Sequence, residues 1–227
     1  MYTYAFLKTP LTPLTLPRGI DTLVQIADAG QLSAVVEPAL DLDSLQKDDT
    51  LLVQAVLAHD RILRSLFCQT TMLPLRFGTS FRSLPSLLAH LHTHQQAYLS
   101  KLIQLEGKAE FTLKLTPVAF PELAIAPEVK GKAYFLAKKE QYQTQLSYQK
   151  QQEDAMRQIE QTIAQTYPHY YLSEAETGAK TLYLLVARDR ESQLCQQVQT
   201  LQQQNPQWEL NLGEALPPYH FATEPTL

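Results

Sequence analysis

The 227-residue chain lacks the features that are typical of nucleic-acid-binding, membrane-spanning and secreted proteins. Its 23 acidic residues outnumber its 19 lysines and arginines, and the net charge of −4 provides no broad basic field for a nucleic acid. No uninterrupted apolar run approaches the roughly 20 residues that a membrane-spanning helix needs. The amino terminus has no basic stretch followed by a long apolar run, so no signal peptide is predicted.

Cysteine is scarce as well. The only two, Cys68 and Cys195, lie far apart, and neither belongs to a C-x-x-C pair. Both fall on apolar stripes of predicted helices, which favours two buried free thiols in a reducing cytoplasm. A disulfide between them is the alternative that the sequence leaves open.

Motifs that mark catalytic and cofactor sites are also missing. The chain contains no G-x-G-x-x-G, G-x-x-x-x-G-K-[ST], H-E-x-x-H or G-x-S-x-G pattern. The nearest approach to a metal site is the pair His90 and His94, which share one face of a predicted helix. A metal site needs a third ligand, so the pair is interpreted as part of a polar helix surface, with a metal-dependent enzyme as the alternative. No catalytic residue, metal or cofactor is predicted.

Four aspartates, Asp41, Asp43, Asp48 and Asp49, lie just ahead of a predicted helix. General acid–base catalysis needs two carboxylates at a fixed separation in a desolvated cleft. Aspartate is also favoured at helix starts, where its side chain accepts hydrogen bonds from free backbone N–H groups. The cluster is therefore interpreted as a solvated capping loop.

The first half of the chain predicts an α+β domain. Strands are expected at 2–7, 22–28, 32–37, 71–75 and 111–116, and helices at 51–67 and 83–105. Gly30 suits the hairpin turn between the second and third strands, and Leu51 and Val56 fall on the apolar stripe of the first helix. The order β, ββ, α, β, α, β is close to the ferredoxin-like arrangement, a split βαβ sheet with two helices on one face. The alternating residues 111–116 suit a strand of that sheet with one buried face.

A proline-rich stretch follows the last of these strands. Pro117, Pro121 and Pro127 each disfavour helix at the residue before them. The domain boundary is placed in this stretch. It separates an N-terminal ferredoxin-like domain at 1–120 from a smaller C-terminal α+β domain at 128–227.

The C-terminal domain is expected to begin with a long helix over 131–167. At 1.5 Å per residue this helix is roughly 50 Å long, so it would overhang a small sheet and leave a kink or an exposed end. A buried strand at 180–187, a helix at 191–204 and an alternating strand at 208–212 follow. Both helices are rich in glutamine, which indicates an ordinary solvated face or, alternatively, a weakly charged protein-binding surface.

One charged residue stands at the end of an apolar strand. Arg76 lies between Leu75 and Phe77, and a buried charge must be paired because its desolvation is costly. We therefore expect a salt bridge that locks the strand to its neighbour. The alternative is an anchor for an anion or a partner through the bidentate guanidinium. Gly78 then lets the chain turn out of the strand toward the next helix.

The same segment carries a family resemblance. Thr71–Phe81, which includes Leu73-Pro74-Leu75-Arg76-Phe77-Gly78-Thr79, is similar to the signature of the gas vesicle protein F/L family. Four further segments resemble the family in the same order: the helix with His59 before Arg61–Leu63, Gly107–Lys114, Gly131–Leu136 and Pro217–Phe221. Gly213–Leu216 departs from the Gly-Pro-Trp-type approach to the terminal motif that members often carry. The chain is identified as a member of this family.

The resemblance implies a two-domain protein of bacterial gas vesicles, which are cytoplasmic organelles. It implies a minor structural or accessory component that binds the small hydrophobic shell protein and other gas vesicle accessory proteins. Such a component would limit shell-protein aggregation during vesicle nucleation. No catalytic activity, cofactor, lipid membrane or small-molecule substrate is implied. The residues of its structural motifs or partner contacts are Leu73, Pro74, Arg76, Phe77, Gly78, Pro217, Pro218 and Tyr219.

A ligand-sensing regulatory module is the alternative function. The α+β pattern fits a ferredoxin-like regulatory domain, and Arg76 would then hold an anionic ligand. Thermal shifts across nucleotides, phosphates and metals distinguish this function from an assembly role.

Overall fold

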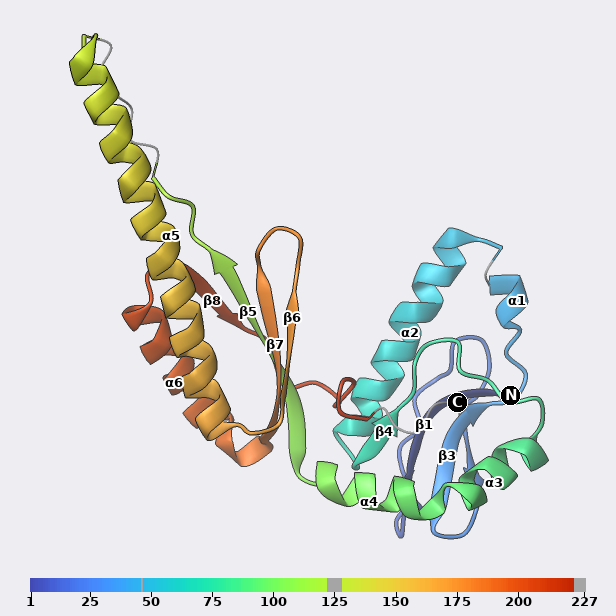
Figure 1. Cartoon of the computed structure of the whole chain (residues 1–227). Coiled ribbons are helices and arrows are strands. Elements are labelled where there is room, and N and C mark those ends of the chain that lie inside the picture. Colours follow the sequence, from blue (N-terminus) through green and yellow to red (C-terminus); the bar gives the residue numbers. More distant parts are fainter. Residues whose placement is uncertain (46, 122–127, 223–227) are drawn as a thin grey trace. The chain divides into compact units, whose positions relative to one another are not determined.

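The computed structural model describes residues 1–45, 47–121 and 128–222 (Figure 1). These residues form an α+β protein, as the sequence predicts, with two four-stranded sheets and helices packed against them. No described helix combines the length and the apolarity needed to cross a lipid bilayer.

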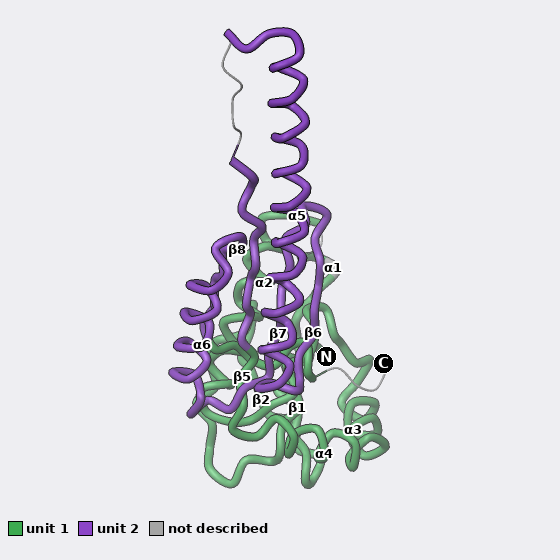
Figure 2. The backbone as a smooth tube through the Cα atoms, turned by 60° about the vertical axis from the view of Figure 1, so that its left-hand side comes forward, with its two compact units in different colours: residues 1–110, 215–227 green, residues 111–214 purple. Residues whose placement is uncertain are grey.

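The chain divides into two compact units (Figure 2). Unit 1 consists of residues 1–110 together with the chain from Ala215 onward, and unit 2 consists of residues 111–214. The predicted boundary lies later, in the proline-rich stretch, and the prediction assigns the end of the chain to the second domain. The end joins unit 1 because the backbones of Glu110 and Leu216 pair with each other in both directions.

The sheet of unit 1 consists of β1 (Tyr2–Lys8), β2 (Gln25–Asp28), β3 (Leu32–Glu37) and β4 (Met72–Pro74), in the order β2-β3-β1-β4. The strand β1 runs antiparallel to both β3 and β4. The predicted hairpin joins β2 and β3, and Gly30 has the positive φ, 89°, that its turn requires. Since β1 lies between β3 and β4, these two strands and the helix that connects them form a split βαβ unit of the ferredoxin-like kind.

The described residues of unit 1 form four helices: α1 (Leu42–Leu45), α2 (Asp49–Phe67), α3 (Leu84–Thr93) and α4 (Gln95–Leu105). The side chain of Asp48 accepts hydrogen bonds from the N–H groups of Thr50 and Leu51, as its predicted capping role requires. The single helix expected over 83–105 is divided at His94, whose backbone leaves the helical region at φ −103° and ψ 13°. Its ring Nδ1 lies 3.0 Å from the carbonyl oxygen of His90, which stabilises the break.

Both faces of this sheet are covered, whereas the sequence predicted two helices on one face. Every residue of β3 and all of β1 except Lys8 are buried. The ring of Tyr4 stacks on His59 of α2, while Phe6 packs against Tyr98 of α4 on the other side. A shift of register between Thr3 and Ala5 sets this alternation. Helix α2 therefore covers one face, and α3 with α4 covers the other (Figure 1).

The sheet of unit 2 takes in the strand predicted to close the first sheet. It consists of β5 (Lys108–Pro117), β6 (Tyr170–Glu174), β7 (Lys180–Ala187) and β8 (Trp208–Leu212), in the order β6-β7-β5-β8. The helices α5 (Lys132–Thr166) and α6 (Glu191–Gln204) connect β5 to β6 and β7 to β8. Each connection spans one intervening strand, so unit 2 contains the full β-α-β-β-α-β ferredoxin-like pattern.

Both long helices of unit 2 pack on one face of its sheet (Figure 1). The strand expected to be buried over 180–187 is buried on one face only, because the buried side chains of β7 alternate, at Leu182, Leu184 and Val186. Against that face α5 buries only residues from Ala155 onward. The earlier part of α5 is the exposed end that its predicted length implied.

Candidate functional site

The segment after β4 is a strand end followed by a tight turn. Leu73 and Pro74 pair with β1, and the carbonyl of Arg76 accepts a hydrogen bond from the N–H of Thr79 at 3.1 Å. Gly78 is the third residue of this turn and has φ +90°. A side chain disfavours this conformation, and a type II β-turn needs it at that position. The glycine exit from the strand is therefore as predicted.

The side chain of Arg76 is exposed, which differs from the expected salt bridge. Among residues 1–45, 47–121 and 128–222, no ion pair includes this guanidinium. The turn uses the backbone carbonyl of Arg76 and leaves its charge at the surface.

A network of buried hydrogen bonds joins this turn to β1 and α2. The hydroxyl of Tyr2 donates to Nδ1 of His59 at 2.7 Å, and Nε2 of His59 donates to the carbonyl of Leu75 at 3.1 Å. This pattern requires the neutral imidazole with its proton on Nε2. Burial lowers the pKa of His59, which favours the same neutral form. The ring of Phe77 meets the rings of Tyr2 and His59 edge-on.

A second buried group, Glu37, holds the loop that joins β1 to β2. Its carboxylate accepts a hydrogen bond from the hydroxyl of Tyr4 and three more from the N–H groups of residues 20–22. Gly19 permits this approach, because a Cβ there would lie 2.5 Å from Oε2 of Glu37. Burial by itself raises the pKa of Glu37, but the hydrogen bonds from the loop and from Tyr4 outweigh it and hold the pKa below its usual value.

The terminal motif returns to unit 1 and binds α2. Pro217 and Pro218 are buried, and the hydroxyl of Tyr219 donates to Oδ1 of Asp60 at 2.6 Å. The other oxygen of Asp60 accepts a hydrogen bond from Nε of Arg64 at 2.7 Å. Asp60 directly follows His59 in α2. Helix α2 therefore contacts the segment after β4 through His59 and the terminal motif through Asp60.

Glu110 is the other anchor of the terminal motif. Its carboxylate accepts hydrogen bonds from the backbone N–H of His220 at 2.8 Å and from the ring Nδ1 of the same residue at 2.7 Å. Burial raises the pKa of Glu110, and the hydrogen bonds from His220 offset part of that rise. The sequence did not single out Glu110 for this role. On the alternating strand Glu110 falls with Thr112 and Lys114 on the polar face, so the alternation predicts an exposed side chain, whereas Glu110 is buried.

The histidine pair considered as a metal site has structural partners instead. Nε2 of His90 lies 2.7 Å from the hydroxyl of Tyr98, and the ring of His90 packs beside Phe6 and Phe81. In the part of the chain that the structure describes, no three side chains of the metal-binding types gather at one point. The pair therefore contributes to packing between α3, α4 and the sheet.

The cysteines are free, but they are less buried than their apolar stripes predicted. Cys68 is exposed at the carboxyl end of α2, and Cys195 is half-buried on α6. Helical periodicity gives the face on which each residue lies, but Cys68 directly follows the last residue of α2 and is open to solvent there.

Helix α2 also presents an apolar surface to solvent. Val53, Val56 and Leu57 have exposed fractions of 58%, 42% and 65%, and we call these three residues the α2 patch. Leu51 is 45% exposed, so it and Val56 lie outside the core to which the apolar periodicity assigned them. The patch lies near the capped amino end of a helix whose opposite side is buried, which gives it a fixed shape.

Comparison with known proteins places the chain in a family. The sequence model described as "Gas vesicle synthesis protein GvpL/GvpF" matches residues 1–223. The chain belongs to the GvpL/GvpF family. This membership confirms the resemblance drawn from the sequence and assigns the chain a role in gas vesicles.

Individual relatives agree with this membership. The chain is 29% identical over 221 residues to gas vesicle protein F of Streptomyces sp. (strain CB03234), covering 90% of this chain and 88% of that protein. The crystal structure of GvpF from Anabaena sp. PCC7120 has a TM-score of 0.70 at 16% identity, with 99% and 96% of the two chains covered. The crystal structure of GvpF from Microcystis aeruginosa has a TM-score of 0.70 at 17% identity, with 98% of each chain covered. These two structures show the same fold.

Replacing Arg76 separates a structural role of this residue from a contact role. For Arg76→Ala we expect the free energy of unfolding to change by less than about 0.5 kcal/mol, because the side chain is exposed. Gly78→Ala is the matched change in the same turn, and it should cost about 1–2 kcal/mol because of its positive φ. Urea denaturation measures both values. A loss above about 1.5 kcal/mol for Arg76→Ala would restore the salt-bridge interpretation.

Proposed function

We propose that this member of the GvpL/GvpF family binds the small hydrophobic shell protein of gas vesicles and limits its aggregation during vesicle nucleation. The family membership supports a gas vesicle role, and the α2 patch is the observation that carries the finer proposal. Contiguous exposed apolar side chains on a folded protein mark interaction sites. A hydrophobic shell subunit is the kind of partner that such a surface fits.

The spacing of the α2 patch favours a helical or extended apolar partner. Val53 and Leu57 are one helical turn apart, and Val56 lies beside them, which is the spacing of the anchors that a helix presents to a groove. Burying an exposed side chain of this size contributes about 1.5–3 kcal/mol. The three together supply enough free energy for a specific contact without any covalent chemistry.

The proposed role is non-catalytic. The buried polar side chains of His59 and Glu37 are already engaged in hydrogen bonds that hold a turn and a loop of unit 1. The exposed turn at Arg76 is proposed as an additional contact for gas vesicle accessory proteins, through the guanidinium.

The test is a double charge substitution in the α2 patch. Val53→Glu with Leu57→Glu should weaken shell-protein binding by at least about tenfold, since two buried apolar contacts would become charged. Leu11→Glu with Ile103→Glu is the matched control, because both residues are highly exposed and lie outside the patch. Pull-down of purified shell protein and light scattering of its aggregation are the two measurements.

Binding and protection by the control variant, together with loss of both in the patch variant, support the proposal. If the unmodified protein neither associates with the shell protein nor changes its aggregation, the proposal fails. If the patch variant binds as well as the unmodified protein, the contact lies elsewhere and the α2 patch is not its site.

A further inference from the structure

The amino-terminal half of α5 extends beyond the sheet of unit 2 and is not covered by it (Figure 1). No residue of α5 before Ala155 is buried. We call Lys132–Ser147 the arm, and at 1.5 Å per residue it is about 24 Å long. A helical segment of that length is marginal in water by itself, so contacts on its sides would stabilise it substantially.

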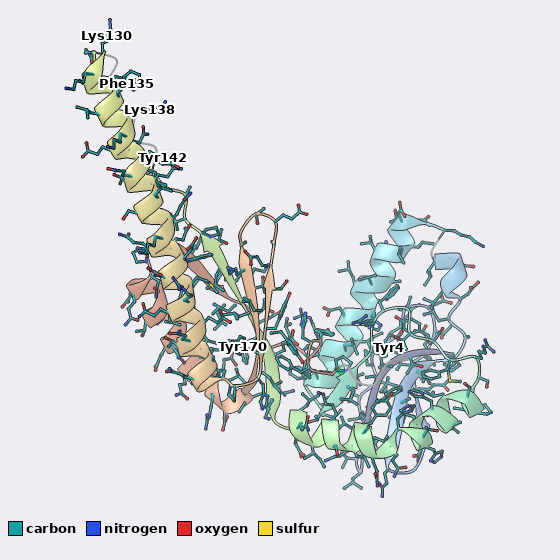
Figure 3. The ribbon with its side chains drawn as sticks, viewed as in Figure 1. Tyr4, Lys130, Phe135, Lys138, Tyr142 and Tyr170 are labelled. Carbon is teal, nitrogen blue, oxygen red and sulfur yellow. The ribbon has the colours of Figure 1, made fainter. Side chains whose placement is uncertain are left out.

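One side of the arm combines aromatic, apolar and basic residues. Phe135, Tyr142 and Leu146 are 75%, 61% and 47% exposed and share a face at helical spacing. Lys138 and Lys139 lie between them in sequence, and Figure 3 shows Phe135, Lys138 and Tyr142 along the projecting helix. Large exposed aromatics beside cations are typical of binding hot spots rather than of ordinary solvated faces.

The charge of the arm defines the kind of surface that it fits. The arm contains three lysines and one glutamate, a net charge of +2 in a chain whose total is −4. Two arms therefore repel each other, because like charges that face each other across an interface are unfavourable. A suitable surface is apolar at its centre and acidic at its edge.

Unit 1 carries such a surface. A groove of about 360 Å³ lies between α1, α2 and the loop that Glu37 holds, and it is lined by Ile20, Leu40, Leu45 and Leu51 together with Asp21 and Asp41. Of the residues that line this groove, Asp21 and Asp41 are acidic and none is basic, a net charge of −2. We call this surface the acidic groove. Its apolar lining and its charge are the complement of the arm.

We propose that the arm of one copy of this protein docks in the acidic groove of a second copy. The apolar lining receives the aromatic side chains of the arm, and the aspartates attract its lysines. The two surfaces differ and lie on different units, so the contact is heterologous and each copy offers one surface of each kind. Association then continues from copy to copy, as an open row or as a closed ring.

This association leaves the α2 patch available. Successive residues of a helix are 100° apart, so Leu51 and Ala55, which line the groove, lie on a different side of α2 from Val53 and Leu57. The inference is independent of shell-protein binding, and it adds a means of placing several α2 patches side by side.

The experiment uses charge reversal in the full-length protein. One variant combines Lys138→Glu with Lys139→Glu in the arm, and the other combines Asp21→Lys with Asp41→Lys in the acidic groove. Sedimentation velocity over about 1–200 μM measures the mass of the unmodified protein, of each variant and of their equimolar mixture. Circular dichroism confirms that each variant is folded.

We expect the unmodified protein to gain mass with concentration and to lose this association at high salt, where charge attraction is screened. Each variant alone should associate at least about tenfold more weakly, since its arm and groove then carry the same sign. The mixture should associate again, because every arm in it finds a groove of opposite charge on the other variant.

Three results overturn the inference. The first is that the unmodified protein stays monomeric at every concentration, even if the monomer itself becomes more compact. The second is a variant that associates as the unmodified protein does. The third is a mixture that stays monomeric although the unmodified protein associates, since that would place the contact outside the arm and the groove.

Discussion

Glu37→Ala is expected to lower the free energy of unfolding of unit 1 by about 3–5 kcal/mol. Glu37 is fully buried, and its carboxylate is the acceptor for Tyr4, for the hydroxyl of Thr22 and for three backbone N–H groups. Alanine leaves those donors without an acceptor, and each buried unsatisfied donor costs about 1–3 kcal/mol. Part of this cost is relieved because the loop at 19–22 moves into water.

Two controls make this result specific. Glu37→Gln keeps the size of the side chain and one carbonyl acceptor, so it should destabilise unit 1 less than alanine does. The pKa of Glu37 is lowered in the folded protein, so its stabilising effect is present above the unfolded-state pKa and is lost as pH falls through the folded value. That window lies below about pH 4.3, and Glu37→Gln should remove this part of the acid sensitivity.

The measurement benefits from the position of the only tryptophan. Trp208 belongs to unit 2, so its fluorescence follows the unfolding of that unit, while far-ultraviolet circular dichroism follows both units. In urea, Glu37→Ala should shift the dichroism transition and leave the fluorescence transition in place. A loss of stability below about 1 kcal/mol would contradict the assigned role of the carboxylate.

Trp208→Ala is expected to destabilise unit 2 by about 3–5 kcal/mol. The indole is 4% exposed at the start of β8, and its Nε1 donates to the carbonyl of Gln152 on α5 at 2.9 Å. The same residue pairs with Pro117 at the end of β5, so it joins two strands and the long helix. Its removal opens a large cavity at that junction and frees one carbonyl.

Trp208→Phe is the matched variant, because it keeps an aromatic ring but loses the hydrogen bond to Gln152. It should cost about 1–2 kcal/mol. Circular dichroism in urea gives both values, and limited proteolysis within 132–150 should accelerate in Trp208→Ala, since this residue holds the base of the arm. An unchanged urea midpoint for Trp208→Ala would show that α5 is held by other contacts.

Features encoded by neighbouring residues were predictable from the sequence. The turn at Gly30, the cap at Asp48 and the end of α5 before Pro168 depend on local backbone geometry, and the sequence predicts all three. The sheet to which residues 111–116 belong was not predictable, because alternation shows that a strand has one buried face but not which strands lie beside it.

The candidate site was predictable only in part, for the same physical reason. The motif around Arg76 marks a turn, but whether its guanidinium is paired depends on residues distant in sequence. Helical periodicity shows that Leu51, Val56 and the buried residues of α2 share neighbouring faces, but it does not show how far another element covers them. Glu37 carries no local signal, since its partners come from a loop fifteen or more residues away.

The return of the chain to unit 1 has a consequence for synthesis. Glu110 and Asp60 are translated before unit 2, but Leu216, Tyr219 and His220, which satisfy them, are translated after it. A growing chain therefore carries a complete second unit before the first acquires its final contacts. Domains generally fold as units, from the amino terminus onward, during translation. Here unit 1 is completed only after unit 2 has been translated, so a chain truncated at residue 214 would leave the buried carboxylate of Glu110 without its partner.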